Sequence, residues 1–325
     1  MTIKHFIISI YFLVVFFFFW YCDAPRNNPF DPQNPDYESA LDLTGSVQTL
    51  RIPHVAISNV KVIWDNRRID YSKTDGSFRF NEVVQENGWL YFENNAYLVD
   101  SFYVDFEKPE PVTKYLNTRP VLDSMQFYSS IDNKNNDRQL TSIVAKLHIS
   151  DPDNDIDSVL IISKTLNFYR SLTYNISNKY FEGSFSFSKP DAVLGHEYEI
   201  YVRDTQKNKI YLTKQIIKRV IKEDIVKLNE PDNGDTTTIT PTLKWQRITN
   251  PGFAYKYTVE IYTDGFNPTL VWHKGDITPD LNVINTITVD VPLTENRYYF
   301  WNVWVVDDYL NRSISLEKGF YANSP

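Results

Sequence analysis

Short runs in which apolar and polar residues alternate recur along the chain. They include residues 60–64, 78–80, 102–104, 145–149, 198–202 and 255–261. Successive side chains of a β-strand point to opposite faces, so each run predicts a strand with one buried face and one hydrated face. The pattern therefore predicts sheets rather than helices.

The composition supports an all-β fold. Of the 325 residues, 42% are hydrophobic and 15% are aromatic, whereas glycine occurs 10 times and methionine twice. Aromatic and β-branched residues favour pleated sheet. The length allows two or three domains of about 100 residues, each with a core of its own. We therefore expect three β-sandwich domains in tandem.

Segments rich in proline and turn residues mark the expected domain boundaries. Proline resists pairing in central strands and stiffens linkers. Pro109-Glu-Pro111 and Thr118-Arg-Pro120 lie between a first and a second unit, and Glu230-Pro231-Asp232-Asn233-Gly234 lies near the start of a third. The predicted sandwiches span residues 40–115, 116–226 and 227–325.

The first unit carries the motifs of a known domain. Asp75-Gly76 lies between two alternating runs, which predicts a hairpin turn. Gly45-Ser-Val47, Val60-Lys-Val62, Thr74-Asp75-Gly76-Ser77-Phe78-Arg-Phe80 and Ala96-Tyr97 together resemble the carboxypeptidase regulatory-like domain. This resemblance implies a transthyretin-like sandwich.

The third unit resembles a fibronectin type III domain over most of residues 231–325. Leu243-Lys-Trp245, the run from Tyr255 to Ile261, and Leu293 six residues before Tyr299 carry the resemblance. It implies that Trp245 is the buried tryptophan of an early strand and that Tyr299 is a corner tyrosine.

A repeated sequence pattern links the second and third units. Tyr198-x-Ile200-x-Val202-x-Asp204-x-x-x-Asn208 is matched by Trp301-x-Val303-x-Val305-x-Asp307-x-x-x-Asn311. The match predicts that two related sandwiches share a late strand and the polar hairpin turn after it. We expect an immunoglobulin-like sandwich for the second unit.

The N-terminus carries an export signal. Lys4 precedes an apolar run from Phe6 to Tyr21, which is too short for an ordinary spanning helix and suits a signal-peptide core. The run ends at Cys22, the only cysteine, so residues 1–21 and Cys22 resemble the signal peptide and lipid-accepting cysteine of bacterial lipoproteins.

Two alternatives to lipidation stay open, because Phe19, Trp20 and Tyr21 differ from the residues usual before that cysteine: an uncleaved N-terminal anchor, or secretion without a lipid. Each places the remaining chain outside the cytoplasm. Residues 22–39, which contain four prolines, are predicted to form a solvated tether like those of some bacterial surface lipoproteins.

Charge and motifs narrow the function. A net charge of −8 and an isoelectric point of about 5.2 argue against a nucleic-acid partner. The five histidines lack metal-ligand spacing, and the chain contains no nucleophile elbow, phosphate loop or dinucleotide fingerprint. We therefore expect no enzymatic activity and no organic cofactor.

One cluster of carboxylates admits two interpretations. Asp151, Asp153, Asp155 and Asp157 occupy alternate positions, and such oxygens can converge on calcium. Ile156 and Ile162 occupy the positions that an EF-hand loop gives to glycine and glutamate, which excludes that motif. Aspartate residues also form turns through hydrogen bonds to the following backbone, so a structural turn is the alternative.

Aromatic residues are the candidates for ligand stacking. If Tyr299 and Trp301 face the core, Phe300 and Trp304 lie on the outer face of the same strand. Trp304 and Trp272 are therefore candidate ligand-binding residues; the alternative is packing against a neighbouring element.

These features favour a non-catalytic lipoprotein of the cell envelope, at the outer membrane or cell surface. The lipid on Cys22 would attach it to the membrane, and the β domains would present a surface to an envelope protein or a glycan. The alternative is an accessory or targeting subunit of an envelope hydrolase.

Overall fold

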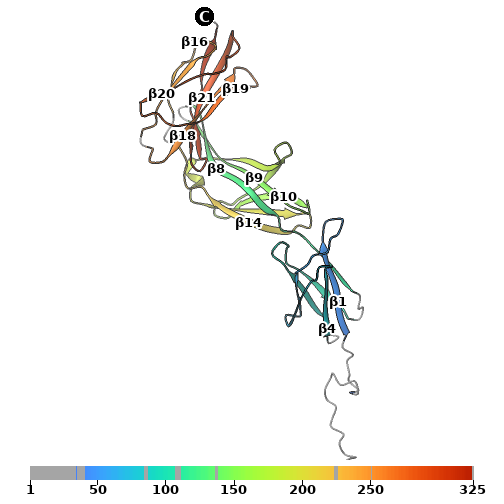
Figure 1. Cartoon of the computed structure of the whole chain (residues 1–325). Helices are drawn as coiled ribbons and strands as arrows, with labels where there is room; N and C mark the ends of the chain where they lie inside the picture. Colours follow the sequence, from blue (N-terminus) through green and yellow to red (C-terminus); the bar gives the residue numbers. More distant parts are fainter. Residues whose placement is uncertain are drawn as a thin grey trace, which may run out of the picture. The chain divides into compact units, whose positions relative to one another are not determined.

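The chain divides into two compact units, one ending at Arg119 and one beginning at Pro120. The computed structural model describes residues 34, 41–83, 87–106, 111–135, 138–222, 226–249 and 251–323. Over these residues, all elements are strands except one short 3-10 helix (Figure 1). The predicted all-β fold class is confirmed.

Unit 1 is a sandwich of two sheets. One sheet has the strand order β4-β1-β7 and the other has the order β3-β2-β5-β6. Strands β1 and β7 are parallel, and the other pairs are antiparallel. The strands are β1 (Leu41–Thr49), β2 (Lys61–Trp64), β3 (Arg68–Tyr71), β4 (Ser77–Val83), β5 (Gly88–Glu93), β6 (Asp100–Val104) and β7 (Val112–Leu116).

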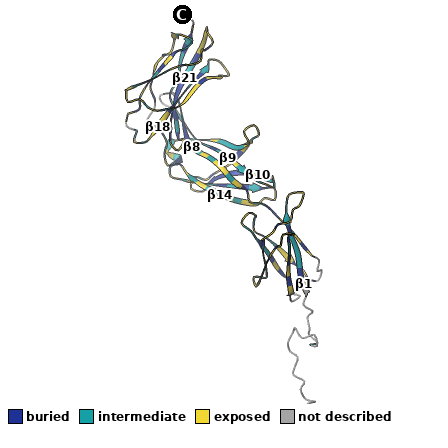
Figure 2. Cartoon of the chain, viewed as in Figure 1, coloured by how far each residue is buried: buried dark blue, intermediate teal, exposed yellow. Residues whose placement is uncertain are grey.

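The core of unit 1 follows the predicted alternation. Val60 and Val62 are fully buried, and Trp64, Phe78 and Phe80 are nearly so. Figure 2 colours the strands by burial. These side chains pack into one hydrophobic cluster between the two sheets. Burying such side chains stabilises each by roughly 1.5–3 kcal/mol relative to leaving it in water.

The hairpin predicted at Asp75-Gly76 is wrong, although the turn itself forms. Asp75 accepts hydrogen bonds from the backbone N–H and the hydroxyl of Ser77, and Gly76 has a φ of 79°. The turn joins β3 to β4, yet β3 pairs with β2 and β4 pairs with β1. The local residues specify a reversal of the chain, and packing across the sandwich selects the partner strands.

The first half of unit 2 forms one core. Strand β11 pairs with β10 through its first part and with β12 through its last part, so it belongs to both layers. The elements are β8 (Val121–Asn135), β9 (Arg138–Ser150), β10 (Ile156–Ser163), β11 (Phe168–Asn175), β12 (Tyr180–Phe187), η1 (Pro190–Val193), β13 (Glu197–Asp204) and β14 (Lys209–Ile216).

The second half of unit 2 forms another core. The sheet β15-β17-β20 lies on one side of it, and β19, β18, β21 and β23 lie on the other. The strands are β15 (Leu228–Glu230), β16 (Asp235–Thr237), β17 (Thr242–Gln246), β18 (Tyr255–Thr263), β19 (Leu270–Ile277), β20 (Ile284–Thr288), β21 (Arg297–Asp307), β22 (Arg312–Ile314) and β23 (Lys318–Ala322).

One sheet runs through both halves of unit 2. The short strand β22 pairs with β21 on one side and, in parallel, with the long strand β8 on the other. The two hydrophobic clusters nevertheless share no buried residue. Unit 2 is thus one compact body with two cores, and the domain boundary expected near residue 226 stays a prediction.

The residues expected inside both halves are buried. Trp245 is fully buried against Tyr257, and Tyr299 donates its hydroxyl hydrogen bond to the carbonyl of Thr294 at 3.0 Å. The hydroxyl of Tyr198 likewise donates a hydrogen bond to the carbonyl of Val193, also five residues upstream, at 3.2 Å. Both halves therefore contain a corner tyrosine, although only Tyr299 was predicted.

Candidate functional site

An exposed group of aromatic and apolar side chains lies on the outer face of the β3-β2-β5-β6 sheet. Strand β5 creates it, because residues 89–92 are all apolar and a strand can bury only every second side chain in one core. Leu90 and Phe92 point inward and are fully buried, so Trp89 and Tyr91 point outward. Together with their neighbours on the same side of the sheet they form the aromatic face, which consists of Ile63, Ile69, Tyr71, Trp89, Tyr91 and Tyr103.

Cross-strand register assembles this face. Trp89 lies opposite Tyr103 of β6, and Tyr91 lies opposite Ile63 of β2. The ring centroids of Trp89 and Tyr103 are 5.2 Å apart at 64°, and those of Trp89 and Tyr91 are 6.5 Å apart at 30°. Trp89 and Tyr103 remain 45% and 49% exposed, so their rings pack on one another and still meet solvent.

A charged pair lies beside the rings on the same face. Lys61 of β2 is opposite Glu93 of β5, and their side chains are 3.0 Å apart. Their side chains are 35% and 44% exposed, so this pair adds at most about 1 kcal/mol to stability. The ammonium group of Lys61 and the carboxylate of Glu93 remain accessible to solvent. The pair is therefore better suited to contact a partner than to stabilise the fold.

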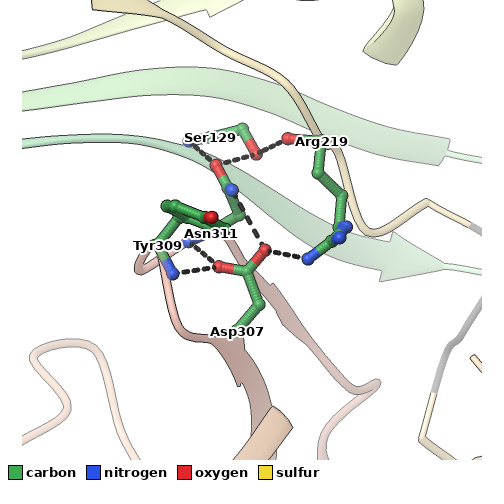
Figure 3. Close-up of polar contacts among 5 residues, drawn as sticks. All are labelled: Ser129, Arg219, Asp307, Tyr309 and Asn311. Atoms are coloured by element: carbon green, nitrogen blue, oxygen red, sulfur yellow. Dashed lines mark hydrogen bonds and ion pairs between the residues drawn. The ribbon is translucent and has the colours of Figure 1, made fainter. Parts of the chain in front are cut away.

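A buried polar cluster holds the two halves of unit 2 together (Figure 3). The side chain of Asp307, at the end of β21, is completely buried and accepts hydrogen bonds from the backbone N–H groups of Tyr309 and Asn311. Its other oxygen lies 2.9 Å from the guanidinium of Arg219. Asn311 in turn accepts a 2.9 Å hydrogen bond from the backbone N–H of Ser129 on β8.

A stacked cation strengthens the same junction. The guanidinium of Arg312, on β22, lies 4.5 Å from the centre of the Trp304 ring and 5.1 Å from that of Tyr128 on β8. Such contacts contribute about 0.5–2 kcal/mol each. Because the polar cluster and this stack both join β8 to the second half, we assign them a structural role.

The sequence pattern shared by the two halves of unit 2 forms the same turn in both. Asn208 and Asn311 each donate side-chain and backbone hydrogen bonds to the aspartate four residues earlier, Asp204 or Asp307. The residue before each asparagine has a left-handed φ, 71° and 68° respectively. The turns differ in burial, since Asn208 is exposed and Asn311 is 4% exposed.

The two tryptophans predicted to bind a ligand have partners within the chain. Trp272 is only 6% exposed and donates its indole N–H to Asp290 at 2.7 Å, which lowers the pKa of that carboxyl. Trp304 donates to Glu260 at 2.7 Å and stacks on Arg312. The Trp272 ring lies in the core, and Trp304 and its strand neighbour Phe300 are engaged in packing within the sheet. Ligand binding at Trp272 and Trp304 stays a prediction.

The outer face near Trp304 contains one further perturbed group. Burial raises the pKa of Tyr262 to about 12, and its hydrogen bond to Glu260 contributes to the same shift. The Tyr262 ring stacks on Phe300 with an angle of 8° between the planes. This network is satisfied internally, so it stabilises the sheet.

The aspartate cluster forms a turn. Asp151 accepts backbone hydrogen bonds from Asp153 and Asp155, and Asp157 lies 3.2 Å from Lys207. Over the described ranges, no three histidine, cysteine, aspartate or glutamate side chains are placed to hold a metal ion together. Calcium binding at this turn stays a prediction.

The N-terminal features lie outside the described residues. These are the signal peptide, Cys22 and, apart from Asn34, the tether. Among the described residues there is no helix whose length and hydropathy suit a membrane span. Lipidation of Cys22 stays a prediction.

The sequence contained a signal for the aromatic face that the alternation pattern concealed. In Trp89-Leu-Tyr-Phe92 both faces of a strand are apolar, so one of them must be covered by a second layer or remain exposed. The sequence alone does not say which outcome applies. The strand lies in a two-layer sandwich, so the outer side stays open.

The fold and the aromatic face define an all-β chain with an exposed group of aromatic and apolar side chains. No family model and no curated protein match it. Matching solved structures include fibronectin(III)-like modules of Clostridium thermocellum CbhA, with 10% identity, a TM-score of 0.28, and coverage of 63% of this chain and 95% of that one.

A second match is a protein from Bacteroides uniformis ATCC 8492, provisionally described as carbohydrate-binding. It has 12% identity, a TM-score of 0.22, and coverage of 55% of this chain and 98% of its own. Values this low carry no information about the site.

Proposed function

We propose that the protein is a non-catalytic binding protein of the cell envelope and that the aromatic face is its contact surface. The observation that carries this proposal is the exposure of Trp89 and Tyr103 on an ordered sheet. Contiguous exposed apolar patches mark interaction sites, and tryptophan and tyrosine dominate the energetics of binding. A sheet holds these rings in place, so little entropy is lost on binding.

Unit 2 acts as a stiff supporting element in this proposal. The continuous sheet through β8 and β22 and the ion pair between the buried Asp307 and the partly exposed Arg219 join its two cores. The sequence supports attachment of the whole chain through a lipid on Cys22. A single acyl chain binds a membrane only marginally, so stable anchoring requires additional lipid chains or contacts.

Sedimentation with isolated envelopes tests the contact surface. The Cys22→Ser protein, which cannot be lipidated, should sediment with envelopes, and the double change Trp89→Ala and Tyr103→Ala should abolish this. Tyr169→Ala is a matched control, because Tyr169 of unit 2 has the same 49% exposure as Tyr103. Equal sedimentation of the double variant and the control would refute the proposed surface.

Fractionation of cells tests the anchor separately. In the Trp89→Ala and Tyr103→Ala background, which lacks the proposed contact surface, the chain with Cys22 should remain with membranes after high salt, and the chain with Cys22→Ser should be released into the soluble fraction. Retention of the Cys22→Ser chain in membranes would instead support the uncleaved anchor.

A further inference from the structure

We propose that the aromatic face binds carbohydrate, as an oligosaccharide or polysaccharide segment lying on Trp89, Tyr91 and Tyr103. This inference rests on the proposed function and names its ligand class. Three observations support carbohydrate over a protein partner: the ring geometry, the charged pair within the surface and the area of the surface.

The ring geometry suits a sugar. The faces of aromatic rings carry negative charge density, and they attract the weakly positive C–H groups on the apolar side of a pyranose. Trp89 and Tyr91 are inclined by only 30° and are 6.5 Å apart, so they offer two similarly oriented surfaces along β5. Tyr103 stands at 64° to Trp89 and forms a side wall.

The charged pair suits hydroxyl groups. Lys61 and Glu93 lie on the same face, two residues from Ile63 and Tyr91 along β2 and β5. The centres of protein interfaces are depleted of charged residues, because burying an ion pair without water is costly. A sugar hydroxyl both donates and accepts, so it can bond to Glu93 and Lys61 while water still reaches them.

The area is small for a protein partner. A standard interface buries about 800 Å² on each side. Trp89 and Tyr103, which are roughly half exposed, and the less exposed Tyr91 together offer on the order of 250 Å². Adding Ile69 and Tyr71 brings the open apolar area to on the order of 500 Å², which is still below that of a standard partner but ample for a few sugar units.

Affinity electrophoresis tests the ligand class. Native gels containing xylan, galactomannan, mixed-linkage β-glucan or dextran, together with a glycan array, are run with the Cys22→Ser protein. We expect at least one polysaccharide to retard the protein and to change its tryptophan fluorescence. Trp89→Ala with Tyr103→Ala should weaken binding about tenfold or more, since ring contacts supply most of the affinity.

Two further variants keep the test decisive. Glu93→Gln preserves the shape and removes one charge, so it should weaken binding without affecting folding; Tyr169→Ala should leave binding unchanged. Retardation that is equal in the double variant and wild type overturns the proposal, as does the absence of binding to every probe. If no glycan binds but envelope sedimentation still requires Trp89, the proposed function survives and the carbohydrate assignment fails.

Discussion

Replacing the two equivalent asparagines of the repeated turn measures how strongly the halves of unit 2 are coupled. Asn311→Ala removes the acceptor for the Ser129 backbone N–H and the hydrogen bond to Asp307. Ser129 is fully buried, so its N–H loses its partner. An unpaired buried donor costs about 1–3 kcal/mol and the lost side-chain bond about 1 kcal/mol, so we expect a destabilisation of about 3 kcal/mol.

Asn208→Ala is the internal control for this change. It removes the corresponding bond to Asp204, but Asn208 is exposed and water can replace the amide. We expect a loss of about 1 kcal/mol or less. Because the turns share their backbone geometry, the difference of about 2 kcal/mol isolates the contact with β8.

Urea unfolding followed by tryptophan fluorescence gives the free energies, and hydrogen exchange locates the change. In the Asn311→Ala protein, exchange should accelerate in β8 and β22, whereas in the Asn208→Ala protein it should accelerate only near the β13–β14 turn. Equal destabilisation by the two variants, with no change in β8, would refute the idea that the cluster couples the two halves.

Three further predictions concern individual residues. Gly45→Ala should destabilise unit 1 by about 3 kcal/mol or more, measured by thermal melting, because a Cβ would lie 2.4 Å from the carbonyl oxygen of Val112. The hydrogen bond from Trp272 lowers the pKa of Asp290 below its ordinary 3.8, so its contribution to stability is present above that pH and lost as pH falls through the lowered pKa. Melting temperatures of wild type and Asp290→Asn should therefore differ at pH 7 and converge in acid; a constant gap would contradict this. Calcium and chelator should give the same melting temperature, because both oxygens of Asp151 accept backbone hydrogen bonds, and a rise with calcium would support the calcium prediction.

The contact between the two halves of unit 2 shows how one sequence pattern, Asp-x-x-x-Asn, forms a local turn in both halves and a contact with β8 in only one. The Asp-x-x-x-Asn spacing produces the same local turn twice, because each aspartate binds backbone and side-chain groups of its asparagine. Only the later copy is buried against β8, where Ser129 and Arg219 meet it (Figure 3). Local chemistry specifies the turn, and its packing partner gives the second copy its additional role.

The sequence by itself determined several strands in which apolar and polar residues alternate, and for most of them the buried face, although Phe102, expected on the same face as Val104, is 39% exposed. Val62, Ile200 and Val303 all lie at alternate positions and are all fully buried, because period-two hydrophobicity is a local property of the backbone. The same holds for the turns at Gly76 and Asn311, whose hydrogen bonds join residues close in sequence.

Only the tertiary structure decided which strands pair and which aromatic rings stay exposed. Strand pairing joins distant segments, so the Asp75-Gly76 turn could not reveal that β3 and β4 enter different sheets. Trp272 and Trp89 are the same residue type and lie on strands β19 and β5, yet one is buried and the other is 45% exposed. The difference arises because a second layer of strands covers only one side of each sheet. The residues around a tryptophan do not specify which side that layer covers.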